Sequence, residues 1–199
     1  MDHFYQDVEG WAAFAELYQV AVQKAPADRA SVFVEVGSWL GRSAAFMSVE
    51  IINSGKPIEL HCVDPWDDGG PDLRDTKYFK ELKDTPFGLF TRNLLPVAGK
   101  VKLATHQMPS LQAAAMFPDQ SIDFIMLDGD HNYEAIHADI EAWLPKMKPG
   151  SIMSGDDYLW PGVTRAADEQ FGKRLRPVIK KASHDYRKSV AYWWVPIPQ

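Results

Sequence analysis

Acidic side chains stand at two places where the sequence predicts that a buried strand ends. Asp128 follows the apolar run 124–127, and Asp156 and Asp157 follow the run 151–155. The carboxyl ends of parallel strands meet at one edge of a sheet, so we expect these three carboxylates to converge. Converging carboxylates repel one another, and a divalent cation that prefers oxygen ligands, Mg²⁺ by default, would relieve the repulsion. In the competing interpretation the aspartates only cap helices and turns.

Two candidate proton acceptors follow the first of these aspartates. Asp130 and His131 lie two and three residues beyond Asp128. A histidine has an ordinary pKa of about 6.5, suited to a general base, whereas an aspartate at about 3.9 would need its pKa raised. We therefore prefer His131 as the base and keep Asp130 as the alternative. A plain surface position for both is the competing interpretation.

A glycine-containing turn is predicted after the first strand. The sequence from Glu35 to Ser43 places Gly37 and Gly41 four residues apart, directly before a helix. Glycine permits positive φ and close approach of a ligand, and a helix start offers free N–H groups. The spacing differs from the dinucleotide-binding pattern, which needs a third glycine in register. A tight turn that binds no ligand would have a similar sequence, so a second feature is needed before this segment can be assigned to a ligand site.

That second feature is Asp64, which closes the predicted strand 58–64. A carboxylate at this strand end can accept both ribose hydroxyls of a nucleoside that lies across the neighbouring strand ends. The competing interpretation is a turn cap before Pro65. The glycine turn and Asp64 together predict a nucleoside site.

Strand and helix patterns alternate through most of the chain. Apolar, β-branched runs predict strands, and periodic apolar residues predict the helices between them. The predicted strands are 31–37, 58–64, 101–104, 121–128 and 151–154, and the predicted helices are 7–24, 42–54, 86–95, 109–117 and 132–147. Alternation of this kind indicates a doubly wound, mostly parallel sheet. The strand-like runs 175–181 and 189–197 have no room for a helix between them and predict a C-terminal antiparallel hairpin.

The composition is that of one globular α/β domain. The chain has 199 residues, a formal net charge of −6 and one cysteine, Cys62. We expect a single domain with an N-terminal helix (1–30), a core (31–172) and a hairpin (173–199). The acidic balance disfavours nucleic acid as a partner and favours a small molecule. No signal peptide or membrane-length apolar run is seen, which predicts a cytoplasmic protein. The oligomeric state stays open, with a homo-oligomer among the options.

The motifs resemble those of class I S-adenosylmethionine-dependent methyltransferases. The stretches 128–134, 143–150 and 155–163 are similar to the macrocin O-methyltransferase-like group, also described as methyltransferase domain 24, whose metal arrangement is like that of catechol O-methyltransferase. The resemblance implies a Rossmann-like fold of seven strands. It also implies that Asp128, Asp156 and Asp157 hold the metal, with Asp157 standing where the catechol enzyme has an asparagine. The implied cofactor-binding residues are Glu35, Gly37, Gly41, Ser43, Asp64 and Asp128.

Four other segments have alternative interpretations. The stretch 105–110 departs from the family's Gly-Asp-Ser turn, so the adenine contact is assigned to His106 or Gln107. The segment 65–84 is either a surface loop or a lid that selects the substrate. Trp66 and Trp160 are expected in loop packing rather than in a substrate wall. Residues 192–194 are expected in the sheet core or at a dimer contact.

The sequence thus predicts methyl transfer from S-adenosylmethionine to a hydroxyl group of a small molecule such as a sugar or natural product, assisted by Mg²⁺ or another divalent cation. Two alternatives remain. One is a methyltransferase without a metal, and the other is a nucleoside-binding regulatory module without turnover.

Overall fold

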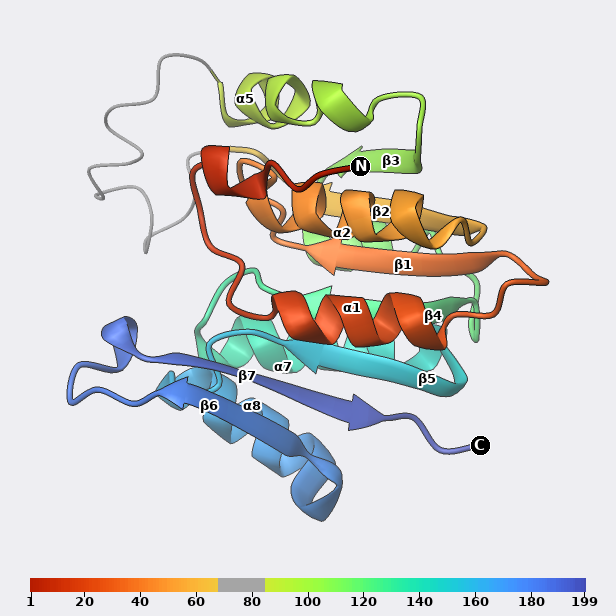
Figure 1. The fold of residues 1–199 in the computed structure, drawn as a ribbon. Helices are drawn as coiled ribbons and strands as arrows, with labels where there is room; N and C mark the ends of the chain where they lie inside the picture. Colours follow the sequence, from red (N-terminus) through yellow and green to blue (C-terminus); the bar gives the residue numbers. More distant parts are fainter. Residues whose placement is uncertain (68–84) are drawn as a thin grey trace.

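The computed structural model describes residues 1–67 and 85–199, and its seven strands form one sheet (Figure 1). The strand order is β3-β2-β1-β4-β5-β7-β6. The strands are β1 (Ser31–Val36), β2 (Ile58–Asp64), β3 (Lys102–Gln107), β4 (Ile122–Leu127), β5 (Met147–Gly155), β6 (Arg176–Lys181) and β7 (Val190–Pro196). Strands β1 to β5 pair in parallel, and β7 pairs antiparallel with both β5 and β6. The predicted Rossmann-like, doubly wound fold with a C-terminal hairpin is therefore confirmed.

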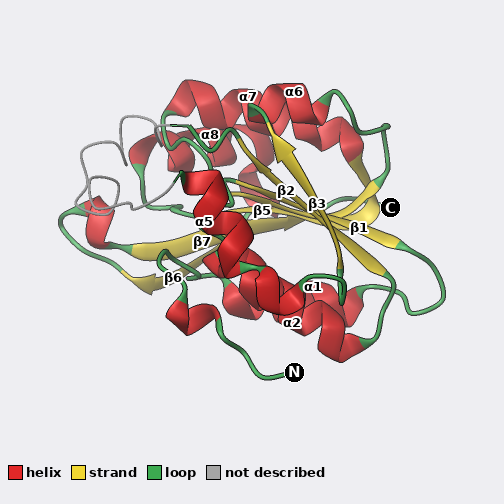
Figure 2. Cartoon of the chain, turned by 90° about the horizontal axis from the view of Figure 1, so that it is seen from above, coloured by secondary structure: helices red, strands yellow, loops and turns green. Residues whose placement is uncertain are grey.

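Helices cover both faces of the sheet, as Figure 2 shows. One face carries α1 (Ala15–Lys24), α2 (Arg42–Ser54) and α5 (Pro86–Asn93), and the other carries α6 (Ser110–Ala114), α7 (Tyr133–Trp143) and α8 (Pro161–Phe171). Each layer has its own apolar core. Successive β1 side chains point to opposite faces, so Phe33 joins the first core and Val34 the second. Burial on both faces explains why the central strands are apolar at nearly every position.

The C-terminal hairpin adds two strands to the sheet, and two of its aromatic residues are buried in the core. Tyr192 packs in the core on the α1 side, and Trp193 is fully buried in the core on the α8 side. Gly155 makes room for this indole, because a Cβ there would lie 2.6 Å from atoms of the Trp193 ring. Of the two expectations for this segment, the sheet core is the one that the structure supports.

The predicted N-terminal helix is wrong over its first half. In place of a helix over 7–24, the chain forms a 3-10 turn at Tyr5–Asp7 and an irregular stretch, and α1 begins only at Ala15. Gly10 has a φ of +126°, which no right-handed helix accommodates. The apolar residues of this stretch do not form one buried helical face, because Val8 is buried whereas Trp11 is half exposed.

Other boundaries also differ from the prediction, and β5 begins at Met147 rather than at 151. Strand β3 extends to Gln107 instead of ending at 104, so His106 and Gln107 belong to the strand. Helix α6 covers only Ser110–Ala114. Helix α7 ends at Trp143, because Pro145 cannot continue it and a 3-10 turn over Leu144–Lys146 leads into β5.

Two further expectations are limited by what the structure describes. Residues 68–84, which make up most of the proposed lid, lie outside the described residues. Within the described ranges, every helix is too short or too polar to span a bilayer.

Candidate active site

The turn after β1 is pressed against the end of β4. Gly37 has a φ of +85°, and a Cβ at this position would lie 1.8 Å from the carbonyl oxygen of Asp128. Its N–H donates to the Val63 carbonyl at 2.8 Å, and the Asp128 N–H donates to the Val36 carbonyl at 2.9 Å. The sequence predicted close approach of a ligand at this glycine; the structure adds a close approach of the protein's own backbone. Gly37 therefore joins the turn to the acidic strand end.

Glu35 lies beneath this turn and is only 1% exposed. The hydroxyl of Tyr18, on α1, donates to its Oε2 atom at 2.6 Å. Burial raises the pKa of Glu35, an effect that Tyr18 and the nearby hydroxyls of Ser38 and Ser43 oppose. The sequence predicted Glu35 and Ser43 as site residues but missed Tyr18. The one available signal was a tyrosine on a buried helix face, since buried tyrosine hydroxyls usually find a polar partner.

The far side of the turn opens α2. Gly41 is its N-cap, in the left-handed conformation with a φ of +88°, and Ser43 is buried in the first helical turn. A Cβ on Gly41 would meet the Phe90 ring at 3.0 Å. Both predicted glycines thus adopt positive φ, and both are crowded by side chains or backbone of other elements.

Asp64, at the end of β2, accepts hydrogen bonds from the backbone of two loops. Its Oδ2 atom accepts a hydrogen bond from the backbone N–H of Trp39 at 2.8 Å, and its Oδ1 atom accepts one from that of Trp66 at 2.7 Å. Both tryptophans have positive φ, of +45° and +47°. Burial raises the pKa of Asp64, and the two backbone hydrogen bonds counteract this rise. A carboxylate has about four acceptor positions, so it retains capacity for ribose hydroxyls.

Trp66 itself is part of the core, as expected. It is 4% exposed and packs against the rings of Phe87 and Phe90, with centroid distances of 4.9 and 4.7 Å.

The two candidates for the adenine contact have different surroundings. Gln107 is exposed and is the register partner of Asp64. His106 is engaged elsewhere, because its Nε2 atom lies 2.9 Å from Nδ1 of His61 and its ring lies 5.6 Å from that of Phe117. Burial lowers the pKa of both histidines. Of the two, Gln107 has the side chain that is still available beside the proposed ribose acceptor.

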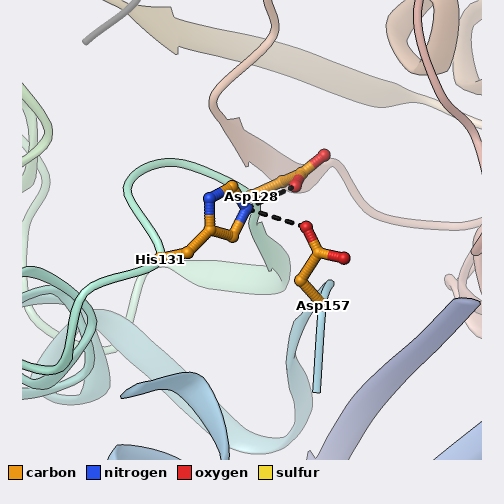
Figure 3. Close-up of side chains that lie close together, drawn as sticks. All are labelled: Asp128, His131 and Asp157. Carbon is orange, nitrogen blue, oxygen red and sulfur yellow. Dashed lines mark ion pairs between the residues drawn. The ribbon is translucent and has the colours of Figure 1, made fainter. Parts of the chain in front are cut away.

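Asp128, His131 and Asp157 form a compact cluster at the ends of β4 and β5 (Figure 3). Their potential ligand atoms all lie within 4.8 Å of one another. The Nε2 atom of His131 is 2.9 Å from Asp157 Oδ2 and 4.0 Å from Asp128 Oδ1. Asp157 has a φ of +49°, a strained conformation for a residue other than glycine. The sequence predicted the two aspartates as ligands and His131 as a base, and the structure brings all three together.

Asp156 lies beside this cluster but is not one of its three members. It is 8% exposed, and its Oδ1 atom is buried without a hydrogen-bond partner among the described residues. Burial and repulsion from Asp157 raise its pKa to about 7. Burial and the charges of Asp156 and Asp157 raise the pKa of Asp128 well above its usual range. In the described part of the chain His131 is the only basic side chain that forms an ion pair with these carboxylates.

Asp130 has a structural task. It is exposed, and its Oδ1 atom accepts a hydrogen bond from the Asn132 N–H at 2.9 Å. Asn132 in turn caps α7 by accepting a hydrogen bond from the Ala135 N–H. The capping interpretation of Asp130 is thereby supported.

The start of α8 packs closely against this loop, because a Cβ on Gly162 would lie 2.6 Å from the His131 carbonyl oxygen.

Trp160 contacts the cluster, whereas the sequence placed it in ordinary loop packing. Its ring centroid lies 4.5 Å from that of His131 and 5.1 Å from that of Tyr186 in the hairpin connection. Tyr186 was not singled out from the sequence, since its proximity depends on how the hairpin packs.

Comparisons with known proteins identify the family and the fold. A family model described as a methyltransferase domain matches residues 34–158. No curated protein sequence matches the chain. Among solved structures, the O-methyltransferase TomG from Streptomyces achromogenes, in complex with SAM, is similar with a TM-score of 0.66 and 13% identity, covering 97% of this chain and 83% of that one. The O-methyltransferase from Bacillus cereus, in complex with SAH, gives a TM-score of 0.62 and 14% identity over 95% and 82%.

The same fold also serves a differently described protein. The precorrin 8w decarboxylase from Methanobacterium thermoautotrophicum has a TM-score of 0.60 and 16% identity, covering 96% of this chain and 94% of that one. Likeness at such low identity establishes the fold, while the family match covers more than half of the chain. This protein therefore belongs to the methyltransferase-domain family and has the fold of class I methyltransferases.

Proposed function

We propose that this protein transfers the methyl group of S-adenosylmethionine to a hydroxyl group of a small molecule, with help from a divalent cation, in the manner of the macrocin O-methyltransferase-like group. Family membership supports methyl transfer. The similar structures that contain SAM or SAH support this choice of cofactor. The observation that carries the rest is the cluster of Asp128, His131 and Asp157 beside the glycine turn.

In this proposal the cofactor lies across the ends of β1 and β2. The amino acid end of the cofactor is surrounded by Glu35, Gly37, Gly41, Ser43 and Asp128. Asp64 accepts hydrogen bonds from its ribose hydroxyls. Gln107 is preferred to His106 for the adenine, because the His106 ring is held by His61. Electrostatics favours a cationic sulfonium here, since acidic groups gather at this edge of the sheet.

The residues present fit a divalent cation. Asp128 and Asp156 have raised pKa values, and Asp157 has a strained backbone conformation. Among the described residues, Asp156 Oδ1 is buried without a hydrogen-bond partner. Carboxylate oxygens are ligands that suit Mg²⁺ or Mn²⁺. Asp128, Asp156 and Asp157 would hold the ion, as the family resemblance implies. When bound, the ion would lower the pKa of the acceptor hydroxyl and stabilise its anionic form.

His131 remains the preferred proton acceptor. Its Nε2 atom faces the carboxylates of Asp157 and Asp128, which would stabilise the imidazolium that forms when it takes a proton. The Trp160 ring packs against the His131 ring at a tilt of 33°. Asp130 is less suited to this role because its carboxylate caps the loop before α7. Much of the rate would come from positioning and electrostatics.

The decisive experiment measures transfer of a labelled methyl group from S-adenosylmethionine to a panel of hydroxylated sugars, phenols and natural products. We expect transfer that needs Mg²⁺ or Mn²⁺ and stops with EDTA. Asp157→Ala should abolish it, whereas Asp119→Asn, which removes an exposed carboxylate paired with Lys146, should not. Full activity in EDTA would support the metal-independent alternative. Cofactor binding without transfer to any acceptor would support a regulatory module.

The remaining expectations belong to this proposal as well. A single domain over residues 1–199, a cytoplasmic location and a small acceptor rather than nucleic acid are predictions from the sequence. The oligomeric state is still open.

A further inference from the structure

Two buried polar atoms beneath the glycine turn have no partner within the described residues. They are Oε1 of Glu35 and Oγ of Ser38, in side chains that are 1% and 2% exposed. A buried carboxylate oxygen without a hydrogen bond costs folding free energy, so native proteins rarely retain one without a reason. In the proposed function, Glu35 belongs to the residues around the amino acid end of the cofactor, which carries an ammonium and a carboxylate group. A ligand group that reaches this position would supply the missing partner.

The other oxygen of Glu35 is fixed by a residue outside the matched family region. Tyr18, on α1, donates to Oε2 at 2.6 Å, and the family match begins only at residue 34. The Tyr18 ring is 1% exposed and is held edge-on against Phe124, at 5.5 Å, and beside Phe14, at 5.0 Å. Such packing leaves the hydroxyl with little freedom. The carboxylate is thereby held in one orientation, with Oε1 left over.

We infer that Tyr18 is a positioning residue for cofactor binding: it orients Glu35 so that Oε1 receives the ammonium group of the cofactor's amino acid end. This inference rests on the proposed function and extends it, because it makes α1 part of the cofactor site. Ser38 Oγ lies beside the carboxylate and completes the polar pair. The hydroxyl of Tyr18 acts through Glu35 and does not itself touch the cofactor.

Two ligands separate this role from a purely structural one. S-Adenosylhomocysteine carries the ammonium and carboxylate groups, whereas 5′-methylthioadenosine lacks the whole amino acid end. Calorimetry on Tyr18→Phe should show about a ten-fold rise in Kd for S-adenosylhomocysteine, equivalent to about 1.4 kcal/mol. The Kd of 5′-methylthioadenosine should stay within about two-fold. A general loosening of the fold would weaken both ligands alike.

Tyr192→Phe is the matched control, since Tyr192 is a buried tyrosine of the same core cluster whose hydroxyl does not bond to Glu35. It should leave both affinities unchanged. A double mutant tests whether Tyr18 acts through Glu35. If it does, adding Tyr18→Phe to Glu35→Gln should cause no further loss of S-adenosylhomocysteine affinity. This background also serves if Tyr18→Phe alone fails to fold, because the neutral amide leaves no buried charge unpaired.

The outcomes are distinguishable. If the native protein binds neither ligand, the proposed function fails. If it binds both, and Tyr18→Phe leaves S-adenosylhomocysteine affinity unchanged or weakens both ligands equally, the inference about Tyr18 is overturned. A further loss in the Glu35→Gln background would also overturn it.

Discussion

Gly37→Ala should destabilise the fold far more than the same change at another glycine of positive φ. The added Cβ would lie 1.8 Å from the Asp128 carbonyl oxygen and 2.4 Å from its carbonyl carbon. Neither partner can easily move, because Gly37 is hydrogen-bonded to Val63 and Asp128 to Val36. The obstacle is backbone on both sides, so no rotation of a side chain can relieve it.

Gly55→Ala is the reference for the expected loss of stability. It caps the end of α2 with a φ of +65°, and a Cβ there would meet nothing within 4 Å. Gly55→Ala therefore incurs only the left-handed backbone strain, about 1–2 kcal/mol. Gly37→Ala has the same strain plus the displacement of a strand end, and we expect a total of at least about 4 kcal/mol, in the range of exceptional point mutations.

Urea unfolding followed by circular dichroism measures both variants against the native protein. Binding of S-adenosylhomocysteine and Mn²⁺ should be weakened together in Gly37→Ala, because this contact joins the glycine turn to Asp128. Equal loss of stability at the two glycines would refute the reasoning. So would a Gly37→Ala protein of native stability, which would mean that the β1 turn and the β4 end are not in contact.

Three further predictions address the site and its surroundings. Asp128→Asn should weaken Mn²⁺ binding at least about ten-fold in calorimetry; unaltered metal affinity would contradict the ligand assignment. His131→Ala should lower kcat by about 10² to 10⁴ and Asp130→Asn by much less, and the reverse order in steady-state assays would make Asp130 the base. His61 and His106 have lowered pKa values in the folded state, so the unfolded state binds more protons. The stabilising contribution of these two histidines should therefore be lost as pH falls below about 6.5, while the raised carboxyl pKa values of Asp128 and Asp156 act in the opposite direction. In urea titrations at several pH values, His106→Gln should make the free energy of unfolding fall less, or rise more, between about pH 7 and 5 than it does in the native protein.

The sequence by itself determined the strands, their parallel arrangement and the residues at their ends. Those features depend on short-range patterns: β-branched apolar runs, glycines before a helix, and aspartates directly after a strand. Asp64, Asp128 and Asp157 could be assigned to one edge of the sheet because a parallel, doubly wound topology leaves few other arrangements. The boundaries of α1 and β3 were missed, because Gly10 and the neighbouring strand β2 act against the local pattern.

Only the tertiary structure decided which side chains meet. Tyr18 reaches Glu35 across 17 residues, and His106 turns toward His61 across 45. Gly37 packs against the Asp128 backbone. Such contacts depend on register, on helix docking and on side-chain direction, none of which a local pattern contains. The residue types that could do chemistry were visible in the sequence, whereas their partners follow from how the layers pack.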